Sequence, residues 1–329
     1  MTRCSFFVYI CLTIGLHFTH KRQQLTNIRM KTLFTALIVG LGALSLSAQE
    51  ATLSLNLTKD QPVTIKTVSK QRIQQTANGQ QMAFDVTSDR VITAKLLDRT
   101  DKELTLSITL DTIHSLVKSP MFSRETNSAT PGNEPIEKVM NKLSQTTMVL
   151  KLSPLGRFLR FDNYPQIRES ILRVLDDVPA NKREETLKQT EAVIKESNLR
   201  SMVEPLFSYF PEKAVKLGDT WETSYVSTSN DMSTIVLSNS TVNKLEGGKL
   251  FYSATGQLES LPATDPNAEM AMDLKGGSTS EGIIDTATGL RTMDTEKANY
   301  QGTTTVRQMG QEMSIPMTID SETTTTMTW

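Results

Sequence analysis

The segment Leu104–Leu110 reads LTLSITL, so apolar and polar residues alternate along it. A period of two is typical of a β-strand that has one face on a core and the other in solvent. The same alternation precedes it at Val63–Gln75 and Met82–Leu97, and Ala77–Gln80 between these two contains an Asn-Gly pair that suits a hairpin turn. These segments predict long antiparallel strands in meander order.

Further strands are expected on either side of this core pattern. Ala51–Leu57 also alternates, as does Thr146–Leu152, whereas Ser119–Pro135 is rich in turn residues and predicts a loop. Ile136–Leu143 is a candidate short helix. In the last third of the sequence the candidate strands are Trp221–Ser227, Ser233–Leu245, Lys249–Leu261, Met270–Ser280, Glu281–Asp285, Leu290–Tyr300, Thr303–Met309 and Met313–Trp329. Their many threonines are expected on the exposed side of the sheet.

The middle of the chain has a helical period instead. From Pro165 to Val178 apolar residues recur every three or four positions, which predicts an amphipathic helix. A second helix is expected from Asn181, because Glu184 follows it in a capping-box arrangement. Leu199–Phe210 is also amphipathic, and Pro205 within it predicts a kink or a new helix start.

The N-terminal region has the plan of a secretory signal peptide. Arg29 and Lys31 precede an apolar run that ends in small residues, which predicts cleavage near Ala48 or Gln49. We expect no membrane-spanning segment after cleavage. The sequence then divides into residues 1–29, an upstream mis-start or extra apolar segment; 30–49, the signal peptide; 50–161, an N-terminal β meander; 162–211, a helical segment; and 212–329, a C-terminal β meander that is either separate or joined with 50–161 in one domain.

The composition of the cleaved chain argues against several function classes. It carries 30 basic and 36 acidic side chains, which disfavours nucleic acid as a partner. Both cysteines and two of the three histidines lie in the removed part, which leaves His114. Thiol chemistry and multi-histidine metal sites are therefore excluded, and His114 at a strand is expected to be a packing or solvated residue. We predict no catalytic, cofactor or metal site and a protein that is not an enzyme; an enzyme that uses carboxylates alone is the remaining catalytic alternative.

Two short motifs resemble a known family. Lys216–Trp221 has the form Lys-x-Gly-Asp-x-Trp, and Leu152–Phe158 reads LSPLGRF. Together with the leader, they resemble a family of unknown function: exported, signal-peptide-bearing, β-rich proteins common in Bacteroidota. The resemblance implies export and supplies no catalytic residue. From the residues themselves, Gly218 and Asp219 are expected to form a turn and Trp221 to start a strand that faces the core.

The fold class that these patterns predict is mainly β (α+β). We expect a long antiparallel curved sheet, or two such sheets, in meander order with two to four helices inserted in the middle. This layout is similar to that of periplasmic lipoprotein carriers, in which a curved open sheet encloses an apolar cavity. The similarity is one of architecture alone.

Methionine enrichment in the last third suggests where a ligand would bind. Its soft side chains line adaptable apolar pockets, although they also fill ordinary cores. The candidate pocket residues are Met270, Met272, Met313, Met317, Leu206 and Phe207. The function expected is non-enzymatic binding of an apolar ligand, lipid or lipoprotein by an exported protein that is periplasmic, outer-membrane-associated or extracellular. The alternative is a structural or protein-interaction module that meets an envelope protein through its strand edges.

Overall fold

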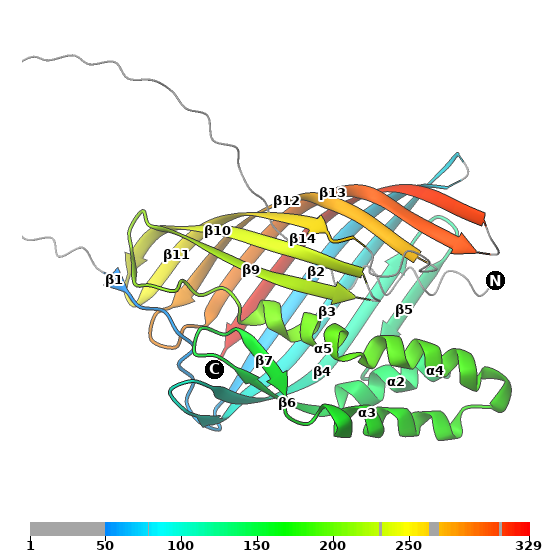
Figure 1. The fold of residues 1–329 in the computed structure, drawn as a ribbon, viewed down its shortest axis with the longest axis horizontal. Helices are drawn as coiled ribbons and strands as arrows, with labels where there is room; N and C mark the ends of the chain where they lie inside the picture. Colours follow the sequence, from blue (N-terminus) through cyan, green and yellow to red (C-terminus); the bar gives the residue numbers. More distant parts are fainter. Residues whose placement is uncertain (1–49, 78, 230–231, 263–269, 309–310) are drawn as a thin grey trace, which may run out of the picture.

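The computed structural model describes residues 50–329 except 78, 230–231, 263–269 and 309–310, so the predicted signal peptide and the segment before it lie outside the described residues. The described chain forms a large antiparallel sheet, a two-stranded ribbon and a group of helices (Figure 1). The predicted class, mainly β with a long antiparallel meander and inserted helices, is confirmed.

The large sheet contains twelve strands, ordered β7-β6-β4-β3-β2-β14-β13-β12-β11-β10-β9, with β5 paired to β4. Their bounds are β2 (Pro62–Ala77), β3 (Gln80–Arg99), β4 (Leu104–Lys118), β5 (Ser123–Asn127), β6 (Thr147–Leu152), β7 (Phe158–Phe161), β9 (Thr220–Ser229), β10 (Met232–Glu246), β11 (Lys249–Ser260), β12 (Met270–Asp285), β13 (Arg291–Gln308) and β14 (Gln311–Thr328). The ribbon pairs β1 (Glu50–Ala51) with β8 (Val215–Lys216). Because β14 pairs with β2, the strands before and after the helical segment belong to the same sheet.

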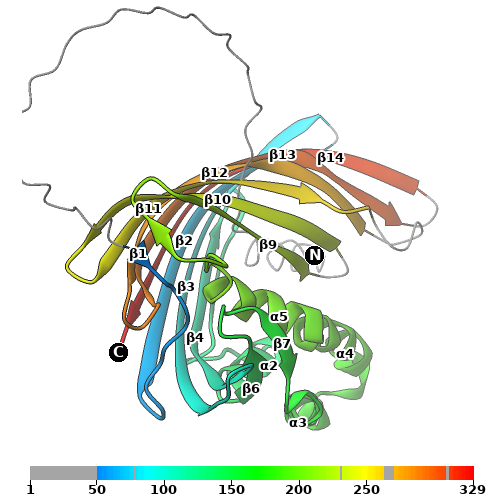
Figure 2. The same ribbon diagram turned by 60° about the vertical axis from the view of Figure 1, so that its left-hand side comes forward.

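Four α-helices lie in the described part: α2 (Pro135–Ser144), α3 (Tyr164–Leu172), α4 (Ala180–Ile194) and α5 (Glu196–Val203). Two 3₁₀ turns, η1 (Arg173–Asp177) and η2 (Glu204–Leu206), follow α3 and α5. The sheet is strongly curved, and the helices lie on its concave side (Figure 2). Helix α2 connects β5 to β6, whereas the others connect β7, at one edge of the sheet, to β9 at the opposite edge.

The structure corrects two local predictions about helices and loops. Helix α4 begins at Ala180 after Pro179 and has no side-chain cap, so Asn181 lies inside the helix and the predicted capping box is wrong. A capping box occurs instead at α2, between Glu134 and Glu137. The predicted loop at Ser119–Pro135 contains β5, whose sequence SRETN has no apolar alternation.

Three strand predictions also change. Most of Ala51–Leu57 is not a strand, although Leu53, Leu55 and Leu57 are buried. This segment forms backbone hydrogen bonds with two turns instead. The Leu55 N–H donates to the Pro154 carbonyl in the β6–β7 turn, and the Asn56 N–H donates to the Thr288 carbonyl in the β12–β13 turn. The two strands predicted between residues 270 and 285 are the single strand β12. In the same way, the strands predicted at Leu290–Tyr300 and Thr303–Met309 belong to the single strand β13, Arg291–Gln308.

The concave face of the sheet carries two separate apolar clusters. The first apolar cluster combines sheet residues such as Ile65 and Leu106 with helical residues such as Ile167 and Leu199. The second apolar cluster contains Ile73, Val86, Val117, Val236, Leu258, Leu274, Tyr300, Met317 and Ile319. Ile65 and Ile73 are an even number of positions apart on β2, so both clusters lie on the same face of the sheet. Among the described residues, no helical side chain belongs to the second cluster.

Candidate functional site: a polar cavity on the concave face

Between the two apolar clusters, the same face of the sheet is polar. On β2, Thr67, Ser69 and Gln71 occupy the inward positions between Ile65 and Ile73, and all three are buried. Similar residues lie next to them on the neighbouring strands. From β4 to β9, the register partners are Ser115, Ser88, Ser69, Thr323, Glu296, Ser280, Ala254, Ser240 and Trp221. We call the six serine and threonine residues of this series the hydroxyl row.

A cavity of about 140 Å³ lies between the hydroxyl row and the segment from α5 to η2. The sheet side of its lining is mostly hydroxyl-bearing and charged, with Arg90, Arg291, Asp294 and Glu296 as the charged residues. The helical segment adds the apolar side chains of Met202, Pro205 and Leu206, and β9 and β10 add Tyr225 and Val236. The lining is therefore amphipathic rather than apolar as the sequence led us to expect.

Arg90 is half-buried at an inward position of β3 and lines the cavity. Its register partners are Thr67 on β2 and Ile113 on β4. Within the described part of the chain, no hydrogen bond or ion pair involves its guanidinium, and burial lowers its pKa from the usual arginine value. A partly desolvated positive charge without a partner is unfavourable, so an anion bound beside this guanidinium would be stabilised.

Arg291 on β13, by contrast, takes part through both Nη atoms in a network that attaches η2 to the sheet, although its buried Nε has no hydrogen-bond partner among the described residues. Its Nη2 donates to the Pro205 carbonyl (2.9 Å), its Nη1 lies 3.5 Å from the Asp294 carboxylate, and its guanidinium lies 4.3 Å from the centre of the Tyr209 ring. The Tyr252 hydroxyl donates to Asp294 (2.5 Å). Burial opposes the positive charge of Arg291, but Asp294 and the two tyrosines outweigh it, so its pKa is raised.

The phenols beside this network are held in the neutral form. Burial raises the pKa of Tyr209 to about 12, and burial together with Asp294 raises that of Tyr252 well above its usual value. Each hydroxyl therefore acts as a donor at neutral pH: Tyr209 donates to the Gly289 carbonyl (2.7 Å) and Tyr252 to Asp294.

The six residues predicted to form a ligand pocket are divided between different places. Met272 and Met317 lie in or against the second apolar cluster, while Met270 and Met313 both pair with Val306 farther along the same strands. The other two, Leu206 and Phe207, belong to the first apolar cluster. Of the six, Leu206 lines the cavity.

The Lys-x-Gly-Asp-x-Trp motif has a structural part in the fold. Gly218 adopts a φ of +84°, and the Asp219 N–H donates to the Lys216 carbonyl (3.0 Å) to close a turn before β9. Trp221 is buried at the start of β9, and its Nε1–H donates to the Tyr209 carbonyl (3.0 Å). The motif thus anchors the chain that follows η2, and none of these three side chains lines the cavity.

His114 lies on the opposite face of the sheet from the cavity, since Ser115 beside it belongs to the hydroxyl row. Its Nδ1 is 3.2 Å from Asp89 and its Nε2 is 3.0 Å from Glu125. Hydrogen bonds that the imidazole makes to these carboxylates, above all the one to Asp89, raise the pKa of His114 above the usual 6.5. With both ring nitrogens engaged, the residue has the geometry of a structural ion pair.

Replacing His114 by Gln is expected to cost more stability at low pH than at high pH. Because the folded-state pKa is raised, the stabilisation is complete below about pH 6.5 and disappears as the pH rises through the folded value. Urea unfolding at pH 5.5 should show a loss of at most about 1 kcal/mol, which shrinks at pH 8.5. A loss that is the same at both values would contradict the ion-pair assignment.

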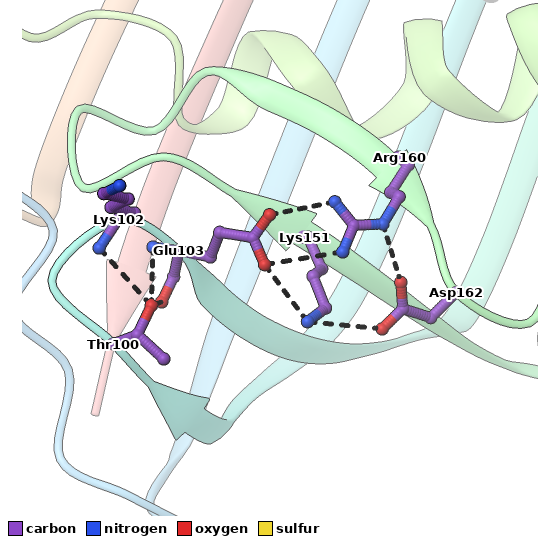
Figure 3. A network of polar contacts seen from close by, with 6 residues as sticks. All are labelled: Thr100, Lys102, Glu103, Lys151, Arg160 and Asp162. Atoms are coloured by element: carbon purple, nitrogen blue, oxygen red, sulfur yellow. Dashed lines mark hydrogen bonds and ion pairs between the residues drawn. The ribbon is translucent and has the colours of Figure 1, made fainter.

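A second charged group lies at the edge of the sheet that ends in β7 (Figure 3). Glu103 accepts from Lys151 (3.2 Å) and Arg160 (2.9 Å), and Asp162 pairs with both cations. Hydrogen bonds from Arg160 and Lys151 lower the pKa of Glu103. All four charges are paired, so this network connects β7 and β6 to the start of β4 and leaves no charge to recruit a ligand. Among the described residues no group of three or more histidine, cysteine or carboxylate side chains could hold a metal ion.

A family of unknown function, DUF6263, matches residues 101–291, which is more than half of the chain. The protein belongs to DUF6263. The matched region of this DUF6263 protein extends from the turn before β4 to Arg291, and it includes the helical segment and the Gly218-Asp219 turn. Arg90 and β14 lie outside it. No curated protein matches the sequence.

Two solved structures have a remote similarity to this DUF6263 protein. The outer membrane protein OprG from Pseudomonas aeruginosa is 7% identical with a TM-score of 0.24, over 84% of this chain and 98% of its own. An outer membrane channel from Pseudomonas putida F1 is 6% identical with a TM-score of 0.26, over 88% of this chain and 100% of its own. Neither score is high enough to support a conclusion. No helix in the described residues is both long and apolar enough to span a bilayer.

Proposed function

We propose that this DUF6263 protein is an exported, non-enzymatic binding protein of the cell envelope that holds an amphiphilic ligand on the concave face of its sheet. The observation that carries the proposal is the amphipathic lining of the cavity. Arg90 and the hydroxyl row supply polar contacts, and Met202, Leu206 and Val236 supply apolar ones. Export is supported by the signal-peptide pattern of residues 30–49.

The size of the cavity limits which part of a ligand it encloses. At about 140 Å³ it is smaller than most small-molecule pockets, which span roughly 300–1,000 Å³. A ligand larger than a single ring therefore extends beyond the cavity. Val236 belongs to the second apolar cluster and Tyr225 packs against it, so the cavity continues into apolar surroundings at these two residues.

The alternative functions have less support. Pairing through strand edges is disfavoured because β7 has only four residues and α5 packs against β9, where the Ser201 hydroxyl bonds both backbone groups of Thr228 (2.9 Å each). For an enzyme that uses carboxylates alone, Asp294 in the cavity would be the natural candidate. It is already held by Arg291 and Tyr252, which suits a structural role better.

Binding can be tested with the neutral fluorophore N-phenyl-1-naphthylamine, whose emission rises in apolar sites. We expect saturable binding of the fluorophore to the signal-cleaved protein. In Val236→Asn the affinity should fall about tenfold, because placing a polar amide against an apolar ligand costs about 1–3 kcal/mol of binding free energy. The matched control is Val226→Asn on β9, since Val226 neighbours the register partner of Val236 but is 42% exposed on the other face. It should bind as the unaltered protein does.

Circular dichroism should show that both variants are folded, and Val236→Ala offers a milder change if the Asn variant is not. Mass spectrometry of protein purified from its native envelope should also reveal a co-purifying amphiphile. Absence of fluorophore binding together with a ligand-free mass spectrum would refute the proposal. Equal weakening by both Asn substitutions would place the binding elsewhere.

A further inference from the structure

We propose that Arg90 binds the anionic head group of the ligand, which makes the ligand class an amphiphile with a carboxylate or phosphate head. The inference rests on the proposed function, because it assigns a head-group site within the same cavity. Arg90 is half-buried, lines the cavity and, among the described residues, forms neither a hydrogen bond nor an ion pair. A guanidinium has five N–H donors, and at this half-buried position none of them has a protein partner among the described residues.

In the part of the chain that the structure describes, no acidic side chain near Arg90 on this face neutralises it. Asp294 and Glu296 also line the cavity, but both lie on β13, three strands away from β3. At the usual strand spacing this separates the backbones by roughly 14 Å along the sheet. Asp294 is moreover paired with Arg291. Asp89, which precedes Arg90 in the chain, points to the opposite face and contacts His114.

The surroundings of Arg90 also suit the geometry of an anion. Thr67 lies directly opposite on β2, and Ser88 lies two positions earlier on the same face of β3. Both line the cavity. Arginine binds carboxylate and phosphate through two parallel hydrogen bonds, and hydroxyls beside it can donate to the remaining oxygens. An anion placed here leaves the rest of the ligand to contact Met202, Leu206 and Val236.

The test compares three ligands that share a ten-carbon chain: decanoate, decyl phosphate and decanol. Each is used to displace N-phenyl-1-naphthylamine from the folded protein and from Arg90→Gln. We expect the unaltered protein to bind the two anions about tenfold more tightly than decanol, and Arg90→Gln to lose that preference while it keeps its affinity for decanol. The control Lys66→Gln removes a positive charge from the exposed face of β2 and should change nothing.

A second measurement separates binding from folding. Because the substitution removes an unpaired, partly desolvated charge, the melting temperature of ligand-free Arg90→Gln should equal or exceed that of the unaltered protein. Decanoate should then raise the melting temperature of the unaltered protein more than that of the variant.

Each outcome has a distinct meaning. Equal affinity for decanol and the anions, or an anion preference that survives Arg90→Gln, overturns this inference and leaves the proposed function standing. Failure of every ten-carbon ligand and of the fluorophore overturns both. If inorganic phosphate or acetate alone raises the melting temperature of the unaltered protein, relative to Arg90→Gln, as much as the alkyl anions do, the site binds a free anion and the amphiphile assignment is wrong.

Discussion

A Gly156→Ala variant is expected to lose about 3 kcal/mol of unfolding free energy or more. Gly156 has a φ of +71°, which strains any residue with a Cβ, and a Cβ placed there would lie 2.0 Å from the Phe207 carbonyl oxygen. The two backbones cannot separate easily. The Gly156 N–H closes the β6–β7 turn by donating to the Ser153 carbonyl (2.9 Å), and the Ser208 hydroxyl donates to the Gly156 carbonyl (3.3 Å).

Gly247→Ala is the matched control for this effect. Gly247 also has a positive φ, +58°, but among the described residues no atom lies within 4 Å of the place of its Cβ. It should therefore lose only the conformational part, about 1–2 kcal/mol. Urea unfolding followed by circular dichroism measures both. Equal losses of unfolding free energy in the two variants would show that the contact between the β6–β7 turn and the segment after η2 contributes little to stability.

Arg291→Met is expected to cost about 3 kcal/mol, because it leaves the Asp294 carboxylate buried without its cation. The Asp294 side chain is only 11% exposed. The same change removes the hydrogen bond to the Pro205 carbonyl and the contact with the Tyr209 ring. We therefore expect η2 to detach from the sheet, which hydrogen exchange of the segment around Pro205 should detect as faster exchange of its amides.

A second substitution tests this explanation. Arg291→Met combined with Asp294→Asn should be more stable than Arg291→Met alone, because the neutral amide removes the buried charge and its oxygen still accepts from Tyr252. The surface control is Arg157→Met, whose partner Glu212 is 66% exposed, and it should change stability by about 0.5 kcal/mol or less. A loss in the control as large as in Arg291→Met would contradict the importance of burial.

The parts of the fold that the sequence predicted are those where a single period dominates. Leu104–Leu110 alternates cleanly and forms part of β4. Pro205 lies in the first turn of η2, which begins at Glu204, so a new helical turn starts at the place that the proline predicted. Ala51–Leu57 has the same alternation as a strand, but whether an extended segment finds a sheet partner depends on the tertiary arrangement. The capping box at Asn181 failed for a similar reason, since Pro179 before it already set the helix start.

The cavity was missed because its polar residues look like an exposed strand face. Thr67, Ser69 and Gln71 share the parity of Ile65 and Ile73, so a stricter reading of parity along β2 would have placed them on the inward face. The threonines of β14 were likewise expected on the exposed side, whereas Thr325 is buried on the concave face. No local signal identifies Arg90 or Arg291, because their importance comes from strands distant in the sequence.

The pairing of β14 with β2 also has a consequence for how the protein reaches its native state. Thr67 and Thr325 are separated by 258 positions in the sequence, yet their hydroxyls lie 3.3 Å apart at the centre of the sheet. Such non-local pairing is slow, because the entropy of closing a long loop is lost before the contact forms. The middle of the sheet is therefore expected to assemble after the two meanders beside it. Until then β2 and β14 are unpaired edges open to intermolecular aggregation, and the cavity that they border does not yet exist.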